Sequence, residues 1–286
     1  MTRWLKWIGL TLGGVLVLAL SVIWLGSELL LRETYTPMLR EVRIPTSPTD
    51  LAEGERLARV LGCMGGCHGR DMEGGDLFDF FDGSQLRSPN LTRIAQDYSP
   101  AQFEAAVRQG IKPDGRSVLA MPSANFATMT DEHLGQILAF IEAYPAQDDQ
   151  PPQHRIMPIA RLFLLLGEFQ PAVAESVPGR NPVNQADLAD PAKLGEYLAL
   201  NACTECHGLD LAGIGGFTPS LVTARAYSEE EFTKLMNEGI ALGGRDVGLM
   251  TEMGQRRFTH LKPFEIRALY GWLQQASLPL TDVTHH

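Results

Sequence analysis

The chain has no excess of basic residues. It carries 24 Lys and Arg against 34 Asp and Glu, a formal net charge of −10 over 286 residues. Residues 1–49 hold five basic and three acidic side chains, so residues 50–286 alone carry −12. Because phosphate binding needs a basic face, this composition argues against nucleic acid as a partner. A basic protein partner suits the charge better.

Cysteine is scarce, with four residues in the whole chain. They form two close pairs, Cys63 with Cys67 and Cys203 with Cys206, and a histidine directly follows each pair. An exported protein could join them as disulfides. Their placement, described below, argues for a different use.

Charged residues are absent between Trp7 and Ser27. That 21-residue run can cross the roughly 30 Å apolar core of a bilayer as one helix. Arg3 and Lys6 precede it, so the positive-inside rule places the N-terminus in the cytoplasm and the remainder outside. A cleaved signal peptide is the alternative, but the run is long for one and no clean cleavage site follows. We therefore predict an uncleaved anchor over residues 1–30 and a linker over 31–49.

Both cysteine pairs lie in motifs typical of covalent haem attachment. Residues 203–207 read CTECH, which has the standard spacing of two residues between the cysteines. Residues 63–68 read CMGGCH, with one residue more. The question is whether this longer motif is a haem site, a metal site or a coincidence.

An internal repeat favours the haem site. GERLARVLG precedes the first pair and GEYLALNA the second; SPNLT (88–92) corresponds to TPSLV (218–222). GIKPDGRSVLAMP (110–122) corresponds to GIALGGRDVGLMT (239–251), and each half ends in an apolar pattern of helical period. The chain thus contains two diverged copies of one unit, and the longer motif occupies the attachment position of the first.

The longer spacing is physically acceptable. On a helix, residues three or four apart share a face, so either spacing can present two thiols to one porphyrin edge. Gly65 and Gly66 add backbone freedom, and His68 still directly follows Cys67. Zinc is the rival ligand for Cys63, Cys67 and His68, but it needs a fourth ligand and leaves the repeat unexplained.

With these motifs, the sequence resembles a membrane-anchored dihaem c-type cytochrome built from two class I cytochrome c domains. The resemblance covers residues 50 to about 275. It implies an all-α fold, with two tandem haem domains after one N-terminal transmembrane helix. The predicted divisions are a first haem domain over 50–145, a proline-rich linker with a short apolar helix over 146–188, a second haem domain over 189–278, and a tail over 279–286.

The resemblance also implies the site residues. Cys63, Cys67, Cys203 and Cys206 would attach two haem c groups; His68 and His207 would be the proximal iron ligands and Met121 and Met250 the distal ones. Met/His ligation raises the reduction potential of haem iron. The carbonyls of Pro89 and Pro219 are expected to accept the ring protons of the two histidines. The other candidates for the distal ligand are Met64, Met72, Met129 and Met253, whereas His133 and His260 are expected to be structural or at the surface.

Two further segments carry expectations. The apolar stretch 156–166 is too short for a second span and contains Arg161, so we predict a short helix packed on both haem domains, with a membrane-surface contact as the alternative.

The segment DMEGGDLFDFFDG (71–83) holds five acids and three phenylalanines. We expect its phenylalanines to wall the haem crevice and its acids to face water; the alternative is a docking patch for a basic redox partner.

The predicted function is electron transfer without bond chemistry. Two Met/His haems, held on the periplasmic side of a bacterial inner membrane, would pass electrons between respiratory or photosynthetic partners, either as a free carrier or as a subunit of a larger membrane complex. An enzyme is the alternative, such as a dihaem peroxidase or a thiosulfate-oxidising cytochrome. Catalysis at iron would need an open coordination position, which an aligned distal methionine in each copy closes.

Overall fold

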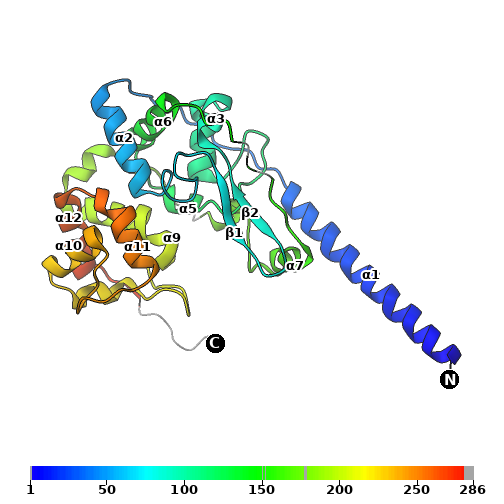
Figure 1. Cartoon of the computed structure of the whole chain (residues 1–286). Coiled ribbons are helices and arrows are strands. Elements are labelled where there is room, and N and C mark those ends of the chain that lie inside the picture. Colours follow the sequence, from blue (N-terminus) through cyan, green and yellow to red (C-terminus); the bar gives the residue numbers. More distant parts are fainter. Residues whose placement is uncertain (1, 150, 152, 177–178, 280–286) are drawn as a thin grey trace.

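A computed structural model describes residues 2–149, 151, 153–176 and 179–279 of the chain (Figure 1). One long helix leads into two helical domains that lie side by side, and a segment that contains one short α-helix connects them. Most of the predicted tail, residues 280–286, lies outside the described part.

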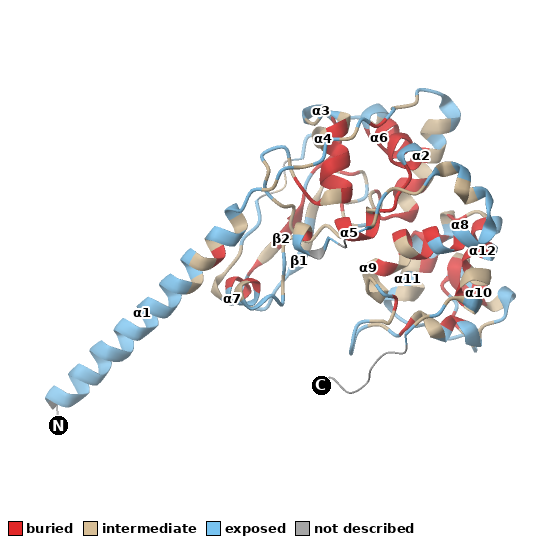
Figure 2. Ribbon diagram, turned by 180° about the vertical axis from the view of Figure 1, so that it is seen from behind, coloured by how far each residue is buried: buried red, intermediate tan, exposed pale blue. Residues whose placement is uncertain are grey.

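Helix α1 (Thr2–Arg32) contains the uncharged run and projects away from both domains (Figure 1). Nearly all of its length is exposed, whereas the buried residues gather in the two domains (Figure 2). Within the described part of the chain it is the one helix long and apolar enough to cross a membrane. The apolar N-terminal helix expected from the sequence is therefore present, and its composition suits a membrane anchor or a signal sequence.

The first domain consists of packed helices with a small hairpin at the side that faces α7 (Pro158–Leu166) (Figure 1). Its elements are α2 (Pro48–Val60), β1 (Gly75–Asp79), β2 (Gln85–Ser88), α3 (Leu91–Asp97), α4 (Pro100–Glu104), the π-helical turn η1 (Ala105–Gln109), α5 (Ser123–Phe126) and α6 (Asp131–Ala143). Three linker elements follow: α7, η2 (Ala172–Glu175) and η3 (Gln185–Ala189).

The second domain repeats this plan without the hairpin. Its elements are α8 (Pro191–Leu198), the π-helical turn η4 (Ala199–Cys203), α9 (Thr204–His207), η5 (Leu221–Ala226), α10 (Glu229–Glu238), α11 (Leu249–Arg256), η6 (Phe258–His260) and α12 (Pro263–Gln275). The apolar patterns that close each half form α6 and α12, as predicted. Ser228 and Glu231 form a capping box at the start of α10, which satisfies backbone N–H groups at that end.

Each domain is built on one close helix crossing, α2 with α6 and α8 with α12. A glycine lies at each crossing. A Cβ on Gly54 would lie 2.0 Å from the carbonyl oxygen of Gln136, and a Cβ on Gly195 would lie 2.3 Å from that of Ala268. These are the glycines that open the repeated Gly-Glu segments of the sequence. The repeat therefore marks the point where two backbones approach most closely.

The predicted all-α fold is confirmed, with one addition. Residues 75–88 fold as an antiparallel hairpin in which Gly75 pairs with Ser88 and Asp79 pairs with Gln85. Its phenylalanines do not wall the crevice, contrary to the expectation, because Phe78, Phe80 and Phe81 are exposed. Alternation along a strand explains the error, since Leu77 turns inward while its neighbour Phe78 turns outward.

The apolar stretch of the linker forms helix α7, but it does not pack on both haem domains as predicted. It lies against α1, where the side chain of Leu165 contacts Gly26. At its N-terminus the Asp82 carboxylate accepts a hydrogen bond from the Ala160 amide at 3.1 Å. The apolar periodicity therefore predicted the helix correctly. It could not predict that the helix packs on α1, which lies far away in the sequence.

Polar contacts hold the two domains together across an otherwise apolar boundary. Arg56 of α2 lies 2.8 Å from a carboxylate oxygen of Glu265 in α12, and Lys262 lies 2.9 Å from Glu53. Burial alone would raise the pKa of Glu53, but hydrogen bonds from Arg56 and Lys262 outweigh it and lower the pKa to about 2. Glu53 is therefore ionised at neutral pH, and the buried charges are compensated by partners from both domains.

His133 has a structural role, as expected, and lies at the same boundary. Its Nδ1 atom is 2.8 Å from the hydroxyl of Tyr197 in the second domain, and its Nε2 atom is 3.2 Å from the amide nitrogen of Gln185. Burial lowers its pKa to about 4, so the ring is neutral at pH 7. Both ring nitrogens are engaged in contacts that join the linker and the two domains.

Replacing Gly54 by Ala should destabilise the protein by about 2–3 kcal/mol, because α2 and α6 must separate to admit the methyl group. Urea denaturation would measure the free energy of unfolding. Gly271→Ala is the matched control, since a Cβ there has no atom within 4 Å and lies in helix α12. That variant should be unchanged or slightly more stable. Equal losses in the two variants would contradict the role of the crossing.

Candidate haem sites

Each domain encloses a cavity next to its Cys-His motif. The cavity of the first domain has a volume of about 570 Å³ and that of the second about 370 Å³. Both volumes lie in the range of cofactor sites. Cys63, Cys67 and His68 line the first cavity; Cys203, Cys206 and His207 line the second. The fold thus places both motifs on the walls of separate, mostly apolar pockets.

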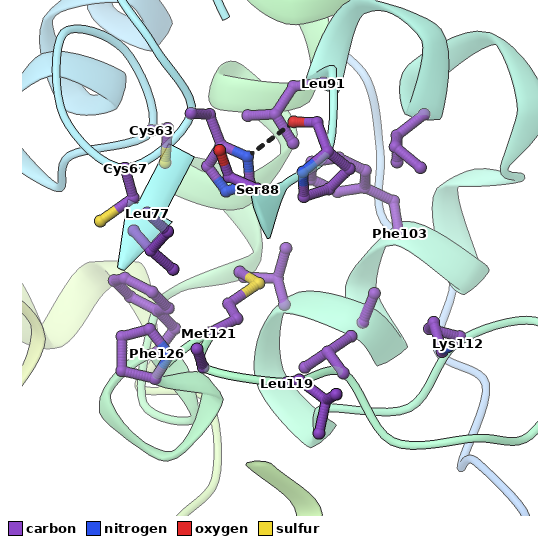
Figure 3. A pocket seen from close by; sticks show the side chains of 18 of the residues that line it. Cys63, Cys67, Leu77, Ser88, Leu91, Phe103, Lys112, Leu119, Met121 and Phe126 are labelled. Carbon is purple, nitrogen blue, oxygen red and sulfur yellow. Dashed lines mark hydrogen bonds between the residues drawn. The ribbon is translucent and has the colours of Figure 1, made fainter. Parts of the chain in front are cut away.

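The two histidines are held in the same way. Nδ1 of His68 lies 3.0 Å from the carbonyl oxygen of Pro89, a contact drawn as the dashed line in Figure 3. Nδ1 of His207 lies 2.8 Å from that of Pro219. These contacts confirm the two expected hydrogen bonds. Because a carbonyl only accepts, Nδ1 carries the proton and Nε2 keeps its lone pair. Burial lowers the pKa of both rings, which favours this neutral form.

Local structure explains why a proline carbonyl reaches each histidine. Asn90, directly after Pro89, caps helix α3 by accepting from the amides of Thr92 and Arg93. Ser220, directly after Pro219, caps η5 in the same manner. The cap sets the direction of the chain at each proline. The repeated Pro-Asn-Leu and Pro-Ser-Leu segments therefore encode a capped turn that orients the ring.

The two cysteine motifs differ in backbone form. The CTECH motif is helical, extending from the end of η4 through α9. The CMGGCH motif lies in a series of turns after α2, so the helical spacing argument for it was wrong. Gly65 has a φ of +71°, and a Cβ on Gly66 would lie 2.7 Å from the carbonyl oxygen of Gly62. The two glycines absorb the extra residue through a turn that few other residues could form.

All four cysteines are free thiols facing the cavities. Burial raises the pKa of Cys63 to about 11 and those of Cys67 and Cys203 to about 12, so these groups are neutral thiols at pH 7. No group of three or more His, Cys, Asp or Glu side chains within the described residues is arranged to hold a metal ion. The arrangement suits covalent attachment of a macrocycle, since each cavity wall presents two thiols beside one imidazole.

The candidate distal methionines also reach the cavities. Met121 lines the first, and Figure 3 shows its side chain directed into the pocket. Met250 and Met253 both line the second. The sulfur of Met253 lies 3.8 Å from Nη1 of Arg257, so it already has a polar partner. Met129 lines the first cavity but is fully buried, whereas Met64 and Met72 are not among the lining residues.

The first cavity has a cationic side that the sequence reasoning missed. It is lined by the cations Arg87, Lys112 and Arg116, and by His154, whose pKa is lowered by burial so that its neutral form is favoured. Lys112 lies across the pocket from Cys63 and Cys67 in Figure 3. Haem carries two propionate carboxylates opposite its vinyl edge, so thiols on one side and cations on the other fit the group. The folded arrangement alone reveals this match, because Arg87 lies far in the sequence from the repeated segment that holds Lys112 and Arg116.

A buried ion pair between the cavities was also missed. Nη1 of Arg257 lies 2.9 Å from a carboxylate oxygen of Glu205, and Arg257 is 5% exposed. Glu205 stands within the second cysteine motif, yet it lines the first cavity. Its other carboxylate oxygen lies 3.6 Å from the sulfur of Cys67. The two attachment motifs therefore meet at the boundary between the domains.

Comparisons with known proteins agree with this geometry. Residues 49–141 match the family model of cytochrome c oxidase, cbb3-type, subunit III, and residues 192–277 match that of cytochrome c. The chain is a c-type cytochrome. Its function is electron transfer, and its two cytochrome c domains imply covalently bound haem c.

A curated relative supports the same assignment. The cytochrome is 26% identical over 269 residues to the fructose dehydrogenase cytochrome subunit of Gluconobacter japonicus. The match covers 80% of this chain and 54% of the relative. The cytochrome thus spans about half the length of that protein.

Met121→Ala and Met250→Ala should each remove part of the near-infrared sulfur-to-iron band of the oxidised protein and lower the potential of one haem. The vacated position should then bind carbon monoxide in the reduced state, which the unmodified protein should bind little. Met253→Ala is the control, because its sulfur contacts Arg257. A normal band in Met250→Ala together with a reduced band in Met253→Ala would reverse the assignment.

Proposed function

We propose that this cytochrome relays single electrons through two haem c groups, one in each cavity. The thioether bonds would form at Cys63, Cys67, Cys203 and Cys206, and the axial ligands would be His68, Met121, His207 and Met250. When bound, haem iron supplies the one-electron redox centre. The protein supplies the orientation of each imidazole, through the proline carbonyls, and a pocket that keeps out water.

The observation that best supports electron transfer between the two haems is the proximity of the two cysteine motifs. Cys67 of the first motif lies 3.6 Å from Glu205 of the second. Each haem would be attached at this side of its cavity, so the attachment edges of the two groups would face the same domain boundary. A chain built this way supports transfer from one haem to the other within a single molecule.

Charges at the boundary would act on both redox centres. Glu205 favours the oxidised, more positive state of a nearby iron, while Arg257 favours the reduced state. Arg257 lines the second cavity and Glu205 the first. Because the pair is buried, its field is little screened by water. The ion pair therefore balances the two potentials from a shared position.

Electron relay, rather than catalysis, suits the side chains on the cavity walls. Each cavity offers a histidine and a methionine, which together would complete the coordination of an iron. All four cysteines face the cavities beside a proximal histidine and would be used in attachment. A peroxidase or a thiosulfate-oxidising cytochrome would need one iron with an exchangeable or thiolate ligand, and the carbon monoxide measurement above tests for such a site.

The cytochrome would work at the outer face of a bacterial inner membrane. In this proposal α1 crosses the bilayer with Arg3 and Lys6 in the cytoplasm, and both haem domains lie on the periplasmic side. The relative is named as the cytochrome subunit of a dehydrogenase, and the first domain matches an oxidase subunit. These likenesses support redox partners within a membrane complex, in which the chain would serve as the electron-transfer subunit.

Two covalent haems should be found in the purified protein. Its intact mass should exceed that of the polypeptide by two haem groups, and haem staining should persist after denaturation. Replacing Cys203 and Cys206 by Ala should leave the mass of one haem, held at the first motif. A single haem in the unmodified protein, with Cys63 and Cys67 free to alkylate, would contradict the assignment of the first site.

Glu205→Gln should raise the potentials of both haems by several tens of millivolts, because it removes a negative charge near each iron at a low effective dielectric constant. Spectroelectrochemical titration would measure the two potentials. Glu252→Gln is the control, since Glu252 is half exposed and pairs with Arg256 on α11. A shift confined to one haem would show that the ion pair is not shared between the two sites.

A further inference from the structure

Helix α7 is fixed to α1 at one level along that helix. The guanidinium of Arg161 lies 3.8 Å from the ring centre of Trp24, 2.9 Å from the Ser27 hydroxyl and 3.1 Å from the Glu28 carboxylate. Ser27 ends the uncharged run that starts at Trp7. If α1 crosses a bilayer, α7 therefore lies where the hydrocarbon core gives way to water.

The tip of the hairpin is fixed beside α7. The Met157 amide donates to the Ser84 hydroxyl at 2.9 Å, and the Ala160 amide donates to Asp82 at 3.1 Å. Figures 1 and 2 both show the turn between β1 and β2 next to α7 and close to α1. Three separate segments of the chain thus meet at the level of Ser27.

The exposed side chains of these segments are apolar. On α7 the exposed residues recur at helical spacing along one face, and on the hairpin Phe78 is 55% and Phe81 84% exposed. Together they form what we call the apolar ledge: Phe78, Phe80, Phe81, Ile159, Leu162, Phe163 and Leu166. On α1, Leu25 and Leu29 lie on either side of Ser27 in the sequence and are exposed as well.

Four of the acids near the ledge are already engaged in polar contacts. Asp76 and Asp79 both bind Arg87, at 2.9 Å and 3.4 Å, and the Asp82 carboxylate is turned onto backbone amides. Glu28 is shared between Arg32 and Arg161. These acids are therefore poorly suited to recognise a basic protein partner. An apolar surface whose exposed unpaired charges, among the described residues, include only Arg155 before α7 and Glu168 after it fits the interfacial layer of a membrane.

We propose that the apolar ledge lies in the interfacial layer of the membrane that α1 crosses. The proposal rests on the anchoring role of α1 in the proposed function. Attachment at the helix and at the ledge, with Arg161 joining the two, would hold the first domain at a set tilt and height above the bilayer. The orientation of the first haem site toward a partner in the membrane would follow from that attachment.

Lipid photo-crosslinking tests the contact in the full-length holoprotein. The protein would be reconstituted in phosphatidylcholine vesicles that carry a lipid with a diazirine on its acyl chain, and adducts would be mapped by mass spectrometry. We expect adducts on α1, on residues 78–81 and on α7. Phe264 is the control, because it is 50% exposed in the second domain and does not line the cavity, and it should carry at least tenfold fewer adducts than Phe81.

The outcomes separate this proposal from the anchor itself. Adducts on α1 alone would overturn the ledge contact and leave the anchor intact. Adducts absent from α1 would overturn the anchor, and the ledge contact with it. Equal labelling of Phe81 and Phe264 would indicate unspecific contact and would also overturn the proposal.

A pair of substitutions provides an independent test. Phe81→Asp with Leu166→Asp should broaden the orientation of the haem planes in aligned bilayers, measured by linear dichroism, with unchanged haem content and melting temperature. Phe264→Asp should leave the dichroism as in the unmodified protein. An unchanged dichroism in the folded double variant would overturn the proposal. If the double variant fails to fold, Phe81→Ser alone should give a smaller broadening, and its absence would overturn the proposal as well.

Discussion

The ion pair of Arg257 and Glu205 is the interaction on which the arrangement of the two candidate haem sites depends. Arg257 also donates through Nε to the carbonyl of Val60, at the end of α2. Its guanidinium packs so closely on Gly62 that a Cβ there would lie 2.9 Å from it. Arg257 of the second domain therefore contacts the segment directly before the first motif. Its partner Glu205 lies next to Cys67 of that motif. Removing either charge would leave the other buried without compensation, which is why both positions are constrained together.

The two domains show how one plan tolerates local change. Both use a glycine at the helix crossing and a capped proline turn beside the histidine. They differ in the motif itself, which is helical in the second domain and a series of turns in the first. The features shared by both domains are those that bring two helix backbones close together, or a histidine nitrogen close to a proline carbonyl. The cysteine spacing can vary because thiols on flexible side chains, next to Gly65 and Gly66, can reach the same cavity by different backbone routes.

A continuous series of contacts joins the apolar helix to the redox sites. Arg161 ties α7 to α1, and the hairpin ties α7 to the first domain through Asp82 and Ser84. The hairpin ends at Ser88, next to the proline whose carbonyl holds His68. Polar contacts at Glu53 and Glu265 then hold the second domain on the first. Any constraint on the orientation of α1 is thus transmitted to the cavities by short contacts, most of them part-buried.

The sequence by itself determined what depends on short-range pattern. The uncharged run, the Cys-His motifs, the repeat and the closing helices were all readable, because each arises from neighbouring residues or from a fixed period along the chain. The two proline contacts followed from the resemblance for the same reason. Tertiary structure alone decided the packing of α7 on α1, the approach of Arg87 to Lys112 around the first cavity, and the Arg257–Glu205 pair. Each of these joins residues that are distant in sequence, and a pattern along the chain carries no information about which distant surfaces meet in three dimensions.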